Sequence, residues 1–116
     1  MRTLAVLFLR LASLVLFATD VRATCIDAPV LTGVNLAGAE FNADKLPGVL
    51  NKDYVYPSAA DLQYFASLGI NTVRLPILWE RVQPKLDSPL DDAQLASIAA
   101  TIALAKHLNL CVILDV

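Results

Sequence analysis

Four residues with polar or flat aromatic side chains lie where apolar, strand-like segments end, or just beyond them: Asn35, Arg74, Trp79 and Asp115. The arginine side chain ends in a guanidinium group with several N–H donors, whereas asparagine and aspartate supply oxygen acceptors. In barrels of parallel strands, the strand ends of one face and the loops after them form the active site. The polar residues of this chain are therefore concentrated where chemistry would take place.

Arg74 is the most informative of these residues. Residues 72–75 form a short segment rich in β-branched side chains, and strand geometry places Arg74 on the opposite face from Val73 and Leu75. A strand between two helices belongs to a parallel sheet that is normally covered on both faces. The pattern thus predicts a buried guanidinium that needs a carboxylate partner. The alternative is that Arg74 extends its head group to the edge of the sheet.

The N-terminal segment has the pattern of a secretory signal. Arg2 supplies a positive start, an apolar run follows over residues 4–18, and small residues precede Thr24. We predict a signal peptide over residues 1–23, a mature domain over residues 24–116, and secretion to the extracellular space or periplasm. A retained membrane helix is the alternative, but the run is short and Arg10 interrupts it, so no stable membrane insertion is expected.

Charge and ligand-forming residues narrow the function further. The whole chain has a formal net charge of −2, and the leader carries more arginine than aspartate, so the mature part is more acidic. An acidic chain without a basic run predicts no nucleic-acid partner. His107 is the only histidine and no Cys or His set has metal-ligand spacing, so we expect no metal. Cys25 and Cys111 can pair in an oxidising compartment, although a buried free thiol is the preferred interpretation for Cys111.

Three strands and two helices are expected to alternate along the mature chain. The strands are predicted over residues 32–36, 72–75 and 111–116, and the third is nearly continuous in apolar residues, as a strand buried on both faces should be. Residues 40–57 and 80–89 are predicted to be irregular. The longer of these loops contains Phe41, Tyr54 and Tyr56, which either line a groove or pack inside the domain.

Both helices have recognisable start signals. Ser58 with Asp61 predicts a capping box for the first helix, and Gly69 a stop at its end. Asp91 with Gln94 predicts the same arrangement for the second helix. The apolar residues of the second helix recur with helical spacing and predict its buried face: Leu95, Ile98, Ala99, Ile102 and Ala103.

The alternation predicts an α/β fold with two right-handed parallel crossovers. A dinucleotide-binding fold would need Gly-x-Gly-x-x-Gly directly after the first strand, but only Gly33 and Gly38 lie nearby and a long loop follows. A TIM (β/α)₈ barrel fits better and contains about 250 residues. The chain is therefore expected to hold the first three βα units of such a barrel, truncated after the third strand.

Several segments, in order, resemble family 5 glycoside hydrolases, in the branch of secreted bacterial and fungal endo-β-1,4-glucanases. Residues 33–41 read Gly-Val-Asn-Leu-Ala-Gly-Ala-Glu-Phe, and residues 69–76 read Gly-Ile-Asn-Thr-Val-Arg-Leu-Pro. Residues 78–84 and 112–115 continue the match as Leu-Trp-Glu-Arg-Val-Gln-Pro and Val-Ile-Leu-Asp. The resemblance covers nearly all of the mature chain.

The resemblance implies a (β/α)₈ barrel that degrades β-glucan such as cellulose with retention and without a cofactor. Its two catalytic glutamates follow the fourth and seventh strands, positions that this chain does not contain, so the chain alone is expected to be inactive. Arg74 corresponds to the arginine that hydrogen-bonds the nucleophile and keeps it ionised. Asn35 corresponds to a position near the site, and Trp79 is a candidate sugar-stacking residue.

Other interpretations remain open at the level of sequence. Glu40 and Glu80 are carboxylates near the strand ends, but they match no catalytic position of the family. A non-catalytic polypeptide that binds glucan or a partner through its aromatic loop is the main alternative. Another family 5 specificity, such as mannanase or exo-β-1,3-glucanase, is the second.

Overall fold

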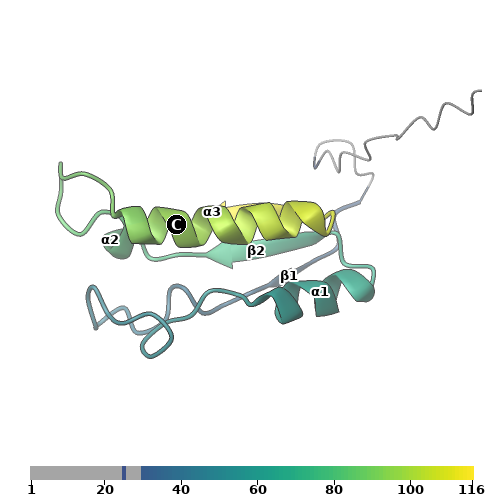
Figure 1. The fold of residues 1–116 in the computed structure, drawn as a ribbon, viewed down its shortest axis with the longest axis horizontal. Helices are drawn as coiled ribbons and strands as arrows, with labels where there is room; N and C mark the ends of the chain where they lie inside the picture. Colours follow the sequence, from purple (N-terminus) through teal and green to yellow (C-terminus); the bar gives the residue numbers. More distant parts are fainter. Residues whose placement is uncertain (1–24, 26–29) are drawn as a thin grey trace, which may run out of the picture.

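The computed structural model describes Cys25 and residues 30–116, so the predicted signal peptide lies outside the described residues. Three parallel strands, β1 (Gly33–Asn35), β2 (Thr72–Pro76) and β3 (Cys111–Asp115), form one sheet in the order β1-β2-β3 (Figure 1). The predicted strands and their parallel arrangement are confirmed. Because neighbouring strands are parallel, each connection must cross from the carboxyl end of one strand to the amino end of the next.

Helix α1 (Ala59–Ser67) connects β1 to β2, and its ends agree with the sequence signals. Ser58 and Asp61 form the predicted capping box, in which each side chain accepts a hydrogen bond from the backbone of the other. The Ser58 hydroxyl, and then its backbone N–H, lowers the pKa of Asp61. Gly69 follows the helix with a φ of +79°, a left-handed conformation that glycine adopts without strain.

Helix α3 (Asp92–His107) connects β2 to β3 and lies along the strands in Figure 1. The Asp91 side chain caps it by accepting from the Gln94 backbone N–H. The reciprocal half of the predicted capping box is absent, because the Gln94 side chain instead hydrogen-bonds Tyr54 and Tyr56.

The buried face of α3 differs from the predicted one. Leu95 and Ile102 are each 39% exposed, whereas the residues that turn inward are Gln94, Ile98, Thr101 and Ala105. The inward face therefore contains two polar residues that hydrophobic periodicity does not register. The hydroxyl of the buried Thr101 has a hydrogen-bond partner within the helix, because it donates to the Ser97 carbonyl one turn earlier.

The described helices pack on one face of the sheet. Val73 contacts a cluster containing Leu62 of α1 and Ala105 of α3, and Leu75 contacts one containing Ile98 of α3. No described helix packs on the opposite face, which carries Arg74. Of the two alternatives for Arg74, the described structure shows the exposed one: its side chain is 45% exposed and is not buried.

The third strand is also less buried than its apolar sequence predicts. Ile113 is 49% exposed and Leu114 is 42% exposed, so the expectation of burial on both faces is wrong. Among the described residues, β3 has a neighbouring strand only on the β2 side. Some of its apolar side chains are therefore left exposed to solvent.

A short helix, α2 (Trp79–Val82), lies where the sequence predicts an irregular stretch over residues 80–89. Leu78 and Trp79 accept the backbone hydrogen bonds that define this single turn. Isolated turns of this length are unstable in water, so tertiary contacts hold α2 in place.

Among the helices that the structure describes, we find none with the length and hydropathy of a membrane span.

Cys25 and Cys111 form a disulfide with a Cα–Cα distance of 5.5 Å, which corrects the preferred interpretation of Cys111 as a free thiol. Cys111 begins β3 and is 6% exposed. Burial alone does not distinguish a free thiol from a paired one, and the distance between two cysteines so far apart in the chain cannot be derived from their sequence positions. The bridge spans a separation of 86 residues and joins Cys25 to the first residue of β3.

We predict that both cysteines resist alkylation in denatured protein until a reductant is added, because the disulfide consumes both thiols. Mass spectrometry after alkylation measures this directly. Cys25→Ser is the control and should expose one labelled thiol at Cys111, with a loss of stability of about 2–4 kcal/mol. Labelling of both cysteines without reductant would contradict the bridge.

Candidate active site

Three of the four sequence-predicted site residues meet at the carboxyl ends of the strands. Arg74 of β2 donates from Nη1 to Asn35 Oδ1 of β1 at 2.7 Å, and from Nη2 to the Asp115 carboxylate of β3. The register pairs Asn35 with Arg74 and Pro76 with Asp115, which places the three side chains on the same sheet face. In the described structure, Asp115 supplies a carboxylate partner for Arg74.

Trp79 is not part of this hydrogen-bonded group. It is the first residue of α2, just beyond the end of β2, and it is 44% exposed. The described structure shows no hydrogen bond between its indole and Asn35, Arg74 or Asp115. Its ring is thus partly accessible to solvent.

A cavity of about 360 Å³ lies next to Asn35, between the end of β1, the loop that precedes α1, and α1 itself. Tyr56, Pro57 and Phe65 form its less polar walls, and Asp61 lies at its border. Asn35 therefore both accepts a hydrogen bond from Arg74 and lines this partly aromatic cavity. Of the loop aromatics left open by the sequence, Tyr56 lines this cavity and Tyr54 is buried at 6% exposure.

Tyr56 is held by a hydrogen bond from its hydroxyl to Gln94 Oε1 at 3.0 Å. Burial raises the pKa of Tyr56 to about 12, and the nearby Tyr54 acts in the same direction. The phenol is therefore neutral at physiological pH and acts as a hydrogen-bond donor to α3. The geometry thus places Tyr56 in the wall of the cavity.

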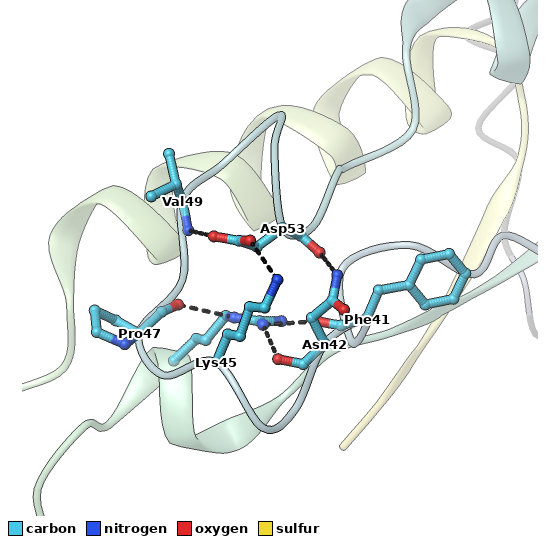
Figure 2. Close-up of polar contacts among 7 residues, drawn as sticks. Phe41, Asn42, Lys45, Pro47, Val49 and Asp53 are labelled. Atoms are coloured by element: carbon cyan, nitrogen blue, oxygen red, sulfur yellow. Dashed lines mark hydrogen bonds and ion pairs between the residues drawn. The ribbon is translucent and has the colours of Figure 1, made fainter.

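The long loop is organised by Arg81, a residue that the sequence analysis did not single out. Arg81 is only 2% exposed, and its guanidinium donates to the backbone carbonyls of Ala39, Phe41, Asn42 and Pro47. Its Cζ atom also lies 4.1 Å from the centre of the Tyr54 ring. Figure 2 shows the carbonyls of Pro47, Phe41 and Asn42 turned toward the same donor group.

A second set of polar contacts joins residues of the same loop to one another (Figure 2). The Asp53 carboxylate accepts from the Val49 N–H at 2.8 Å and pairs with Lys45 at 3.5 Å. The Asn42 side chain donates to the Asp53 carbonyl. The Val49 N–H, followed by the charge of Lys45, lowers the pKa of Asp53. The loop is thus held by specific polar contacts although it contains no strand or helix.

The sequence offered little signal for Arg81. Its acceptors are backbone carbonyls 34 to 42 residues earlier, and carbonyls are present at every position. Only the family-like run over residues 78–84, which contains α2, marks the segment that carries Arg81. The described residues contain no cluster of three or more His, Cys, Asp or Glu side chains that could hold a metal ion.

The fold and site together define an α/β protein whose polar group lies at the carboxyl ends of parallel strands. A family model described as cellulase, glycosyl hydrolase family 5, matches residues 34–116. The chain belongs to glycosyl hydrolase family 5, and its βαβαβ arrangement is part of the (β/α)₈ barrel of that family.

Solved structures and curated relatives agree with this assignment. An endo-β-1,4-glucanase from Xanthomonas axonopodis pv. citri is 55% identical with a TM-score of 0.67, over 69% of this chain and 25% of its own. The endoglucanase Cel5A of Pseudomonas stutzeri is 41% identical with a TM-score of 0.72, over 73% of this chain and 26% of its own. Endo-β-1,4-glucanase B of Emericella nidulans is 36% identical over 70 residues, which are 60% of this chain and 21% of the relative. The chain thus spans about a fifth to a quarter of the length of the proteins that it matches.

We predict that Arg81→Met lowers the free energy of unfolding by at least about 3 kcal/mol, because it leaves several buried carbonyls without a donor. Arg81→Lys should cause a smaller loss, because lysine keeps the positive charge and some N–H donors. The loss should not vanish, because a single ammonium group cannot reach all four carbonyls. Urea denaturation measures both variants. Arg74→Met is the matched control, and we expect a loss of at most about 1 kcal/mol because this ion pair is exposed. Equal losses at the two arginines would contradict the structural role of Arg81.

Proposed function

We propose that this chain forms the first part of the catalytic barrel of a secreted endo-β-1,4-glucanase, which hydrolyses β-glucan with retention. The observation that carries the proposal is the convergence of Asn35, Arg74 and Asp115 at the carboxyl ends of three parallel strands. Barrel enzymes place their chemistry at this face of the sheet. The family match over residues 34–116 supports the same conclusion.

In the proposed reaction, the residues of this chain orient groups and do not attack the substrate. Retention requires two carboxyl groups about 5 Å apart, one as nucleophile and one as acid/base. By family resemblance these are glutamates after the fourth and seventh strands, and the 116 residues contain neither position. Arg74 is proposed to hydrogen-bond the nucleophile, which favours its ionised form. Residues 1–116 alone are therefore expected to be inactive.

The proposed substrate is an unbranched β-1,4-glucan such as cellulose. Structures similar to this chain include XacCel5A in complex with cellopentaose and the Pseudomonas stutzeri enzyme in complex with cellobiose. Arg74 and Trp79 are both about half exposed, so they can reach a ligand lying across the strand ends. Asn35 is proposed to bind a sugar hydroxyl and Trp79 to stack on a sugar ring.

A non-catalytic role in glucan binding is the second candidate, because aromatic exposure on the described surface favours it. Phe41 is 50% exposed and Trp79 is 44% exposed. Aromatic rings of this kind present flat apolar area at little entropic loss. Binding of insoluble cellulose by a chain that never supports hydrolysis would favour this candidate.

A chimaeric enzyme tests the proposed activity. Residues 30–116 would replace the matching quarter of the Xanthomonas axonopodis endoglucanase, and reducing-sugar release from carboxymethylcellulose would be measured. We expect activity in the chimaera, none in residues 24–116 alone, and a loss of at least about 10²-fold in kcat/KM for Arg74→Ala. Lys52→Ala, at an exposed loop position, is the matched control and should retain activity.

The outcomes separate the alternatives. A folded chimaera without hydrolytic activity would contradict the proposal. Faster cleavage of mannan or β-1,3-glucan than of carboxymethylcellulose would reassign the specificity within the family. Cleavage by residues 24–116 alone that Arg74→Ala abolishes would show that the catalytic groups lie within this chain.

Secretion is part of the same proposal and has its own test. The pattern of Arg2, the apolar run over residues 4–18 and the small residues before Thr24 supports a cleaved signal. We predict that exported protein begins at Thr24, as N-terminal sequencing would show. Exported protein that still begins at Met1 would contradict cleavage.

A further inference from the structure

The guanidinium of Arg74 is held from both sides by partners on neighbouring strands. Asn35 of β1 accepts from Nη1 at 2.7 Å, and Asp115 of β3 accepts from Nη2. β2, which carries Arg74, lies between these two strands in the sheet. Each terminal nitrogen therefore has a separate partner, and both partners are fixed to backbone that belongs to the ladder.

We propose that Asp115 is a positioning residue that, together with Asn35, fixes the plane of the Arg74 guanidinium across the three strand ends. This inference rests on the proposed function, because the purpose of the fixed plane is to aim the remaining N–H groups of Arg74 at a nucleophile carboxylate or a sugar hydroxyl. A guanidinium has five N–H donors, and the two bonds to Asn35 and Asp115 leave three of them available.

The arrangement contributes orientation more than stability. The Arg74 and Asp115 side chains are 45% and 44% exposed, and ion pairs with this exposure are screened by water. An arginine side chain has many rotamers, so an unrestrained guanidinium at this position would sample several directions. Partners on strands hold a functional group more precisely than partners on loops do.

The pairing also sets the local charge. Asp115 cancels the charge of Arg74, whereas Asn35 adds an acceptor without adding charge. The group therefore presents directed donors with little net charge, which suits a neutral polyol or a carboxylate already held by other groups. An unpaired arginine would instead attract any small anion.

Rotation of the guanidinium group, measured by ¹⁵N NMR on the isotopically labelled chain in the absence of glucan, tests the proposal. We expect slow rotation about the Cζ–Nε bond of Arg74, about tenfold faster rotation in Asp115→Ala, and an intermediate rate in Asp115→Asn, which keeps an oxygen acceptor. Asn35→Ala should also accelerate the rotation, but less than Asp115→Ala. Asp44→Ala removes a carboxylate from the exposed loop and is the matched control.

Arg81 serves as an internal reference in every sample, because four carbonyls restrain it. Its slow rotation should be unchanged in all variants, which separates a local effect on Arg74 from loss of the fold. Fast rotation of Arg74 in the parent chain, equal rates in the parent and Asp115→Ala, or fast rotation of Arg81 in the parent would each overturn the proposal. These readouts need no hydrolysis, so failure of the positioning role is distinct from failure of the chimaera to cleave glucan.

Discussion

The structure depends on the burial of one positive charge without a carboxylate partner. Removing a guanidinium from water is unfavourable unless most of its donors are satisfied. Arg81 meets this requirement with four backbone carbonyls and the face of Tyr54, and no described carboxylate pairs with it. Those carbonyls must point inward together, so the constraint determines the path of the loop between β1 and α1. It also anchors α2, which is too short to be stable alone.

The effect of this constraint extends to α3 and to the site. Tyr54, beneath the Arg81 guanidinium, accepts a hydrogen bond from Gln94, and Gln94 in turn accepts one from Tyr56. The two tyrosines therefore hold Gln94 inward and set the rotation of α3, which explains why Leu95 faces outward. Tyr56 then lies against the cavity next to Asn35. A buried scaffold contact is in this way linked to the residues at the strand ends.

The parts of the fold that could be predicted from the sequence are those determined by near neighbours. Ser58 and Asp61 lie three residues apart, so the capping box is readable from sequence alone. The inward face of α3 was not predictable, because it depends on tyrosines about 40 residues away, as the separations of 38 and 40 residues show. The pairing of Cys25 with Cys111 spans 86 residues and failed for the same reason. At the candidate site, the strand pattern around Arg74 predicted that it pairs with a carboxylate, as it does with Asp115, but its exposure depends on which face of the sheet the helices cover.

The two arginines show how the same side chain is assigned to different tasks by its surroundings. Arg81 is 2% exposed and its acceptors are carbonyls of one loop, so its donors are consumed within the fold. Arg74 is about half exposed and is held by only two acceptors, one of them charged, on separate strands. It lies near the carboxyl ends of the strands, where barrel enzymes place their active sites. Burial therefore separates an arginine whose donors are used within the loop from one that is proposed to meet a ligand, a distinction that neither residue type nor local sequence provides.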